Sequence, residues 1–302
     1  MAARIFHFKK IHYYLIPLVA LVVWWGMLIA LLSAWSLQGK PIYDFMKGEA
    51  QNPIYISDIG ATNLQPLFIA CVGFQMIFFV GTLVMEYVLR KKKKLQPYVS
   101  KKQPIFAIIS IVFAVIGQLG ILFVACFRSP SFKTVHLSMV GVFIVGEFLA
   151  CVFNFFNSFL FGYLPGRLNP NHEKVIFGKH RFANLYMVSF VCKLFWLMAA
   201  IVFALLFGIF MKRKERSLSA IFEWTISFWY GMLLLFWSID LFPSAVKHYE
   251  VHHAQKVGET FVDNHQAPIV VDEELTEKLV SSTDGSSSPV PVQPPEQLHL
   301  HV

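Results

Sequence analysis

The chain has 302 residues, of which 56% are hydrophobic, and its formal net charge is +8. This composition excludes a soluble globular domain and a disordered protein, because the apolar residues come in runs long enough to cross a bilayer. We expect an all-α integral membrane protein, a six-helix bundle with spans at about 14–37, 66–89, 104–127, 135–163, 183–211 and 221–242.

We expect residues 1–242 to form a transmembrane domain and residues 243–302 to form a cytosolic, mostly disordered tail. The first span is too long, and too poorly followed by a cleavage site, to be a signal peptide, so we expect a signal anchor. The tail carries nine acidic residues against three lysines, and 281–295 is rich in Ser and Pro.

The connector after the second span is the most basic loop, and positively charged loops favour the cytosol. Both termini then also face the cytosol, because six spans return the chain to its starting side. The cluster Lys212–Arg216 disagrees with this orientation, and a re-entrant fifth segment would move it. We expect the first five basic residues of the connector to contact anionic inner-leaflet phospholipids: Arg90, Lys91, Lys92, Lys93 and Lys94.

A polar segment, Pro53–Gly60, lies between the first two spans, on the side opposite the connector. Ser57 and Asp58 favour a turn, Gly60 tolerates positive φ, and residues such as Tyr55 favour an ordered extended backbone. We therefore expect a structured non-cytosolic surface. An ordinary turn leading into the second span is the alternative.

Two ionisable residues fall deep inside spans, Glu147 in the fourth and Lys193 in the fifth. At about 1.5 Å per residue both lie near the middle of the membrane, so we expect an intramembrane charge pair. A proton site or a lipid-headgroup site is the alternative. Glu86 and Arg90 are one turn apart and predict an ordinary helix pair.

Two further groups lie on the side of the polar segment: His136 opens span four, and Glu223 with Trp224 opens span six. Asp58, His136 and Glu223 would share one membrane face and form the only grouping suited to acid-base chemistry. The chain carries no familiar catalytic, phosphate-binding or nucleic-acid motif, so we expect no catalytic residue, metal, cofactor or nucleic-acid partner.

The segment Tyr55–Gly60, His136, Glu223–Trp224 and the Asp240 that closes span six together resemble the family that joins the Frag proteins, the DRAM autophagy modulators and the Sfk proteins. The resemblance covers roughly residues 11–242. Trp24-Trp25-Gly26 and the long tail are most similar to the fungal Sfk branch. The resemblance implies a six-span protein without an established catalytic centre, associated with the plasma membrane, a phosphatidylinositol 4-kinase complex and phospholipid asymmetry.

We therefore expect a plasma-membrane regulator or scaffold linked to phosphoinositide synthesis and phospholipid organisation, and not an enzyme. Its expected partners are membrane lipids and a phosphatidylinositol 4-kinase complex. An enzyme or accessory of GPI-anchor or lipid remodelling, in the ER or Golgi membrane, is one alternative. A vacuolar or lysosomal autophagy modulator is the other.

Overall fold

The computed structural model describes residues 12–46, 51–169 and 184–242. Within these ranges six helices are long and apolar enough to cross a membrane: α1 (Leu15–Leu37), α3 (Gln65–Lys91), α4 (Gln103–Cys126), α5 (Lys133–Tyr163), α6 (Leu185–Lys212) and α7 (Arg216–Leu241). The short helices α2 (Ile56–Gly60), η1 (Asp44–Met46) and η2 (Pro165–Arg167) lie in connectors, and this part of the chain holds no β-strand. The expectation of an all-α, six-span membrane protein is confirmed, while the expected tail lies outside the described residues.

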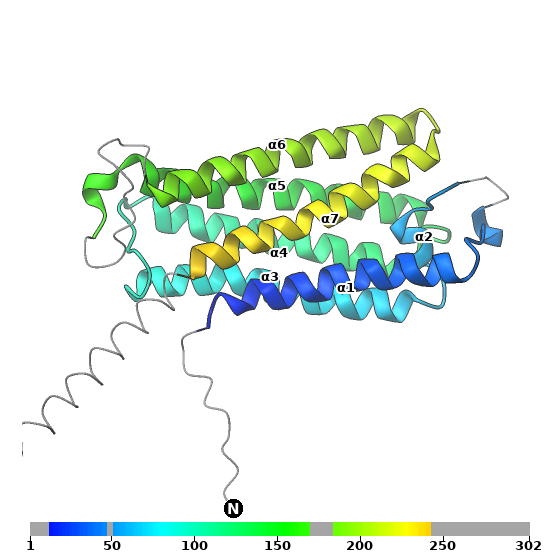
Figure 1. Cartoon of the computed structure of the whole chain (residues 1–302), viewed down its shortest axis with the longest axis horizontal. Helices are drawn as coiled ribbons and strands as arrows, with labels where there is room; N and C mark the ends of the chain where they lie inside the picture. The colour runs from blue at the N-terminus through cyan, green and yellow to red at the C-terminus, as the bar shows by residue number, and fades with distance from the viewer. Residues whose placement is uncertain (1–11, 47–50, 170–183, 243–302) are drawn as a thin grey trace, which may run out of the picture. The chain divides into compact units, whose positions relative to one another are not determined.

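The long helices run alongside one another, so the bundle has two ends (Figure 1). We call the end that carries α2 the α2 end, and the end that carries Lys91–Lys94 the lysine end. The start of α1 and the end of α7 both lie at the lysine end. Helix α6 is continuous along the bundle and ends at Lys212, so the cluster Lys212–Arg216 lies at the α2 end and the fifth segment is not re-entrant.

Local sequence signals explain several helix boundaries. Proline stands in the first turn of α3 and of α4, where its missing N–H costs nothing. The Asn184 side chain accepts a hydrogen bond of 2.9 Å from the Met187 N–H and so caps α6. Helix α7 begins at Arg216, five residues before the expected start of the sixth span at Ile221. The additional polar turn packs onto α6, because the buried Ser219 donates a hydrogen bond of 3.0 Å to the Phe207 carbonyl.

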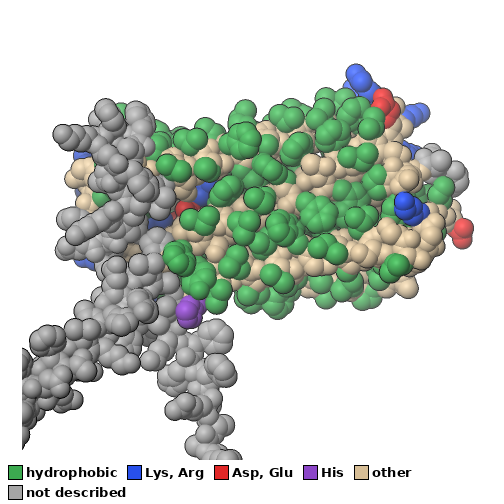
Figure 2. All heavy atoms as spheres, in the orientation of Figure 1, with side chains coloured by type: hydrophobic (Ala, Val, Ile, Leu, Met, Phe, Trp, Pro, Cys, Tyr) green, Lys and Arg blue, Asp and Glu red, His purple; other side chains and the backbone are tan. Residues whose placement is uncertain are grey.

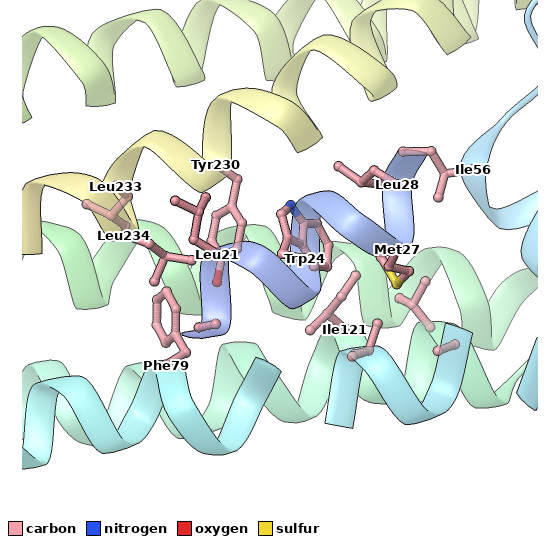
Figure 3. Packing of buried hydrophobic residues seen from close by; sticks show 14 of the residues in the cluster. Leu21, Trp24, Met27, Leu28, Ile56, Phe79, Ile121, Tyr230, Leu233 and Leu234 are labelled. Atoms are coloured by element: carbon pink, nitrogen blue, oxygen red, sulfur yellow. The ribbon is translucent and has the colours of Figure 1, made fainter. Parts of the chain in front are cut away.

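The core is centred on α1 (Figure 3), where Leu21, Trp24, Met27 and Leu28 are buried against α7, α3 and α4. The part of α1 nearer the α2 end, at Leu28, lies close to Ile56. The part nearer the start of α1, at Leu21, lies close to Phe79 of α3 and to Tyr230, Leu233 and Leu234 of α7. Hydrophobic side chains also cover the outside of the helices along their length (Figure 2), as a surface in contact with lipid requires.

Polar and close-packed contacts hold the helices together, since lipid removes the usual hydrophobic advantage of helix association. Helices α4 and α5 approach closely at Gly117, Gly120 and Gly146, where an added Cβ would lie within about 3 Å of the facing backbone. Helices α6 and α7 exchange two indole hydrogen bonds: Trp196 donates to the Trp229 carbonyl at 2.8 Å, and Trp229 donates to the Trp196 carbonyl at 3.0 Å.

Candidate functional site

The segment 51–62 is docked on the first turns of α7, through contacts to its own backbone. The Ile56 N–H donates to the Glu223 carboxylate at 2.8 Å, and the Trp224 indole donates to the Ile54 carbonyl at 2.9 Å. The carboxylate thereby satisfies an N–H in the first turn of α2 that has no partner within the helix. Ile54 and Ile59 are fully buried, so this segment covers the α2 end of the core.

Tyr55 and Asp58 of this docked segment lie close to Ser219 and Glu223 of α7. Burial raises the pKa of Asp58 from 3.8 to about 6. Burial also raises the pKa of the Tyr55 phenol, as do the nearby Glu223 and Asp58 carboxylates, while a hydrogen bond with Ser219 opposes them. Two carboxyl groups thus come close to one another in a partly buried setting. Ser57 is half-buried in the same short helix.

Gly60 serves close packing, whereas the sequence suggested positive φ. Gly39 is the one glycine with positive φ among the described residues. A Cβ on Gly60 would lie 2.5 Å from Cδ1 of Phe68, so the phenyl ring occupies the space that a side chain would need.

His136 is at the same end of the bundle but has a different partner. Its side chain is 4% exposed, and its Nδ1 lies 2.8 Å from the Phe127 carbonyl oxygen, which ties the start of α5 to the end of α4. The structure therefore brings Asp58 and Glu223 together, while His136 makes a separate helix-end contact. In the described ranges no group of three His, Cys, Asp or Glu side chains is arranged to hold a metal.

The predicted pair of Glu147 with Lys193 is wrong. The Lys193 ammonium, which is 1% exposed, forms an ion pair with Asp240 and a hydrogen bond of 2.9 Å to the Ser158 hydroxyl. Similar depth did not bring the two charges together, because the flexible lysine side chain extends toward the lysine end, where Asp240 closes α7. Glu147 instead accepts a hydrogen bond of 2.7 Å from Gln118 on α4.

The interior at the lysine end holds a connected polar network. Arg90 and Glu86 form the expected helix pair, with 2.9 Å between the guanidinium and the carboxylate. Glu86 also accepts from Asn154 of α5 at 3.2 Å, and Asn154 accepts from the Trp237 indole of α7 at 3.1 Å. These contacts join α3, α5 and α7.

The expected lipid contact needs one correction, because Arg90 turns inward. It is 5% exposed, donates to the Gln96 carbonyl at 3.2 Å, and lies with its guanidinium carbon 4.5 Å from the Phe161 ring centre. The four residues after it, Lys91 to Lys94, are all exposed. The glutamate one turn earlier was the signal that Arg90 differs from the lysines that follow it.

Sequence reasoning missed a polar chain in the middle of the bundle. Gln75 of α3 and Gln118 of α4 both donate to the Tyr230 hydroxyl of α7, at 2.9 and 2.7 Å, and Gln118 also reaches Glu147. A glutamine in the middle of each of two apolar spans was the available signal, because an amide in lipid needs a partner.

Comparisons with known proteins match most of the described bundle. A family model described as the Frag1/DRAM/Sfk1/Cwh43P N-terminal domain matches residues 12–244. Protein SFK1 of Saccharomyces cerevisiae is 33% identical over 278 residues, which cover 76% of this chain and 78% of the yeast protein. Protein sfk1 of Schizosaccharomyces pombe is 24% identical over 231 residues, covering 76% of this chain and 64% of that protein.

No solved structure matches the chain. The match of the family model runs from the residues just before α1 to those just after α7, so it includes the docked segment, the polar chain and the lysine end. The chain belongs to the Frag1/DRAM/Sfk1 family, and its two relatives support the Sfk branch of that family.

Proposed function

We propose that this protein is a plasma-membrane regulator or scaffold that links anionic phospholipid of the cytosolic leaflet to a phosphatidylinositol 4-kinase assembly, and so supports phosphoinositide synthesis and phospholipid organisation. The observation that carries the proposal is the run of four exposed lysines, Lys91 to Lys94, at the end of α3. Membership of the Sfk branch supports the link to the kinase.

The lysines stand on a well-defined turn. Lys93 adopts a left-handed conformation with φ of 55°, and the Lys94 N–H bonds to the Leu89 carbonyl at 2.8 Å, which closes the end of α3. Leu89 and Leu95 on either side are buried against Leu241 of α7. The turn therefore presents its charges from a packed base, and each lysine near an anionic leaflet contributes roughly 1 kcal/mol of attraction.

A regulator fits the α2 end better than an enzyme does. Glu223 holds the backbone of α2, and His136 holds the end of α4. Both side chains therefore have structural roles. Asp58, the third member of the expected acid-base group, lies near Glu223 and apart from the contact that His136 makes. The GPI-anchor and autophagy alternatives rest on the family resemblance alone.

The test replaces Lys91 to Lys94 with glutamine in the full-length protein. We expect normal abundance, at least a tenfold loss of preference for phosphatidylserine over phosphatidylcholine in proteoliposomes, and reduced kinase recruitment in cells, because up to about 4 kcal/mol of attraction is removed. The matched control replaces Lys212, Arg213 and Lys214 at the α2 end, and it should retain both properties when phosphatidylserine is confined to the leaflet at the lysine end. Equal loss in the two variants, or no loss in the first, would contradict the proposal.

A second test addresses the enzyme alternative. Asp58→Asn and His136→Gln keep the shape of each side chain but remove its titration. For a scaffold, any loss of function in these variants should follow the loss of folded protein. A stable, correctly located Asp58→Asn protein with normal kinase recruitment but no lipid-remodelling activity would favour the enzyme.

A further inference from the structure

Glu147 is a buried carboxyl group in the middle of α5, and no positively charged side chain among the described residues pairs with it. One of its oxygens, Oε1, accepts from the Gln118 amide at 2.7 Å, while Oε2 is buried and has no hydrogen-bond partner among the described residues. No Lys, Arg or His in the described ranges lies within ion-pair distance of it. The residue is 8% exposed in a bundle whose outer surface meets lipid.

The groups that surround Glu147 are neutral hydrogen-bonding groups from three other helices. Gln118 connects it to the Tyr230 hydroxyl, and Tyr230 connects it to Gln75. The side-chain oxygens of Gln75 and Gln118 are also buried and have no partner in the described part of the chain. Such a chain offers the carboxyl group a hydrogen bond, but it supplies no positive charge.

The titratable groups that face this chain are few. Cys151 lies one turn after Glu147 on α5 and is buried. The Lys193 ammonium is held by Asp240 and Ser158, away from Glu147. Among the described residues that form this chain, Tyr230 of α7 is titratable, whereas the side chains from α3 and α4 are glutamines, which do not titrate.

An ionised carboxylate in such a place costs many kcal/mol unless it is paired, and buried acids take up a proton instead. On the side of α4, Glu147 is packed closely against the backbone. A Cβ on Gly117 of α4 would lie 2.9 Å from the Glu147 backbone nitrogen and 3.0 Å from its Oε1.

The two ends of the bundle differ in their access to this group. Toward the lysine end, α5 presents the buried residues Cys151, Asn154 and Ser158 at helical spacing, and α3 presents Thr82 and Glu86. Toward the α2 end, mostly apolar residues of α5 separate Glu147 from the buried His136, and the core there holds buried apolar side chains such as Met27, Leu28, Ile121 and Val124. In the part of the chain that the structure describes, the buried polar side chains that follow Glu147 along α5 therefore lie on its lysine-end side.

We propose that Glu147, with Gln118, Tyr230 and Gln75, forms a reversible proton-binding site in the middle of the membrane that exchanges its proton with the lysine end of the bundle. This site does not depend on the proposed contact with lipid or kinase. It gives the bundle a single neutral-to-negative transition at its centre, where the tightly packed α4 and α5 meet.

The first experiment uses dicyclohexylcarbodiimide, an apolar reagent that adds to protonated carboxyl groups, on the wild-type protein in detergent near neutral pH. Mass spectrometry should find a stable adduct on Glu147, with a yield that falls as the pH rises and is lost in Glu147→Gln. The matched control is Asp44→Asn, which removes an exposed carboxyl group at the α2 end and should leave the adduct unchanged. If about 100 mM NaCl protects Glu147 from the reagent and choline chloride does not, the site binds a metal cation and not a proton, and the proposal is wrong.

The second experiment needs no reagent to reach the site. Near neutral pH, the infrared difference spectrum between the wild-type protein and Glu147→Gln should contain the C=O band of a protonated carboxyl group. If the two spectra are identical, Glu147 is ionised and the proposal is wrong, whatever the carbodiimide result.

The direction of access has its own test. In sealed proteoliposomes of one orientation, the carbodiimide adduct should follow the pH of the compartment that faces the lysine end. Asn154→Leu should slow this response at least tenfold without changing its end point. A response that follows the opposite compartment would overturn the proposed path.

Discussion

At the residue scale, one glycine allows α1 to contact α7. The Trp25 indole donates to the Phe228 carbonyl at 3.0 Å, and it occupies the position where a Cβ on Gly231 would stand. The neighbouring Trp24 donates to the Ser227 carbonyl at 2.7 Å. Gly231 therefore determines how closely the first and last spans approach, although nothing in its local sequence indicates a partner in α1.

Gly231→Ala should destabilise the protein by about 1–3 kcal/mol, because the indole must move or the helices must separate. Gly26→Ala is the matched control, since its Cβ meets no heavy atom within 4 Å, and it should leave stability unchanged or slightly improved. Thermal unfolding in detergent measures both. Adding Trp25→Phe to Gly231→Ala should recover part of the loss, and equal melting temperatures for the two alanine variants would contradict the packing.

The buried ion pair of Lys193 with Asp240 gives a second prediction. Lys193→Met should leave the carboxylate of Asp240 unpaired and cost about 3–5 kcal/mol, whereas Lys193→Met with Asp240→Asn should recover part of this cost. Abundance in membranes and thermal unfolding report the change. Rescue of Lys193→Met by Glu147→Gln in place of Asp240→Asn would instead support the pairing that similar depth suggested.

At the element scale, α2 is a five-residue helix that depends on its neighbours. Such a short helix is not stable alone, since one turn closes few hydrogen bonds for the residues it orders. It is held here by Glu223 at its first turn, by the Trp224 indole on the preceding segment, and by the burial of Ile56 and Ile59. Its stability is therefore tertiary in origin.

The docking of α2 should weaken as the pH rises. Burial raises the pKa of Asp58 from 3.8 in the unfolded chain to about 6, so between these values the folded state binds more protons than the unfolded state. The stability contributed by protonated Asp58 is fully present below about pH 4 and is lost as the pH rises through about pH 6.

Between about pH 5 and pH 7 the wild-type protein should lose about 1 kcal/mol relative to Asp58→Asn, which does not titrate there. Hydrogen exchange at the amides of 56–62 gives the local measurement, and the difference between the two proteins removes the contribution of other groups. A difference that is constant with pH, or that grows in the opposite direction, would show that Asp58 is not buried in this way.

At the scale of the whole molecule, six full-length helices place the docked segment and the lysine turn at opposite ends of the bundle. The orientation expected from the basic loops puts the lysine end in the cytosol. The exposed cluster Lys212–Arg216 at the α2 end remains the basic loop that disagrees with this bias.

Substituted cysteines test the orientation in intact cells with a membrane-impermeant maleimide. A cysteine at Thr62 should be labelled, and a cysteine at Ser100 should be labelled only after the membrane is permeabilised. Cys126 must first be replaced, because it is exposed at the α2 end and would itself react. Labelling at Ser100 in intact cells would reverse the assignment.

The sequence by itself determined the features that depend on composition and on neighbours along the chain. Long apolar runs require spans in a bilayer, and Pro66 and Pro104 stand where helices begin. The pair of Glu86 with Arg90 also follows from local spacing, because residues four apart share a helix face.

Only the tertiary structure decided which side chains meet. A position along a span gives the depth of a residue, but it gives neither the direction in which the residue faces nor the helix that lies opposite. Lys193 therefore pairs with Asp240, and Glu147 accepts a hydrogen bond from Gln118. At position 60, a glycine is needed because the ring of Phe68 fills the space of a side chain, and not because of the backbone angles. Both outcomes depend on how the helices are rotated and packed against one another, which no single stretch of the chain contains.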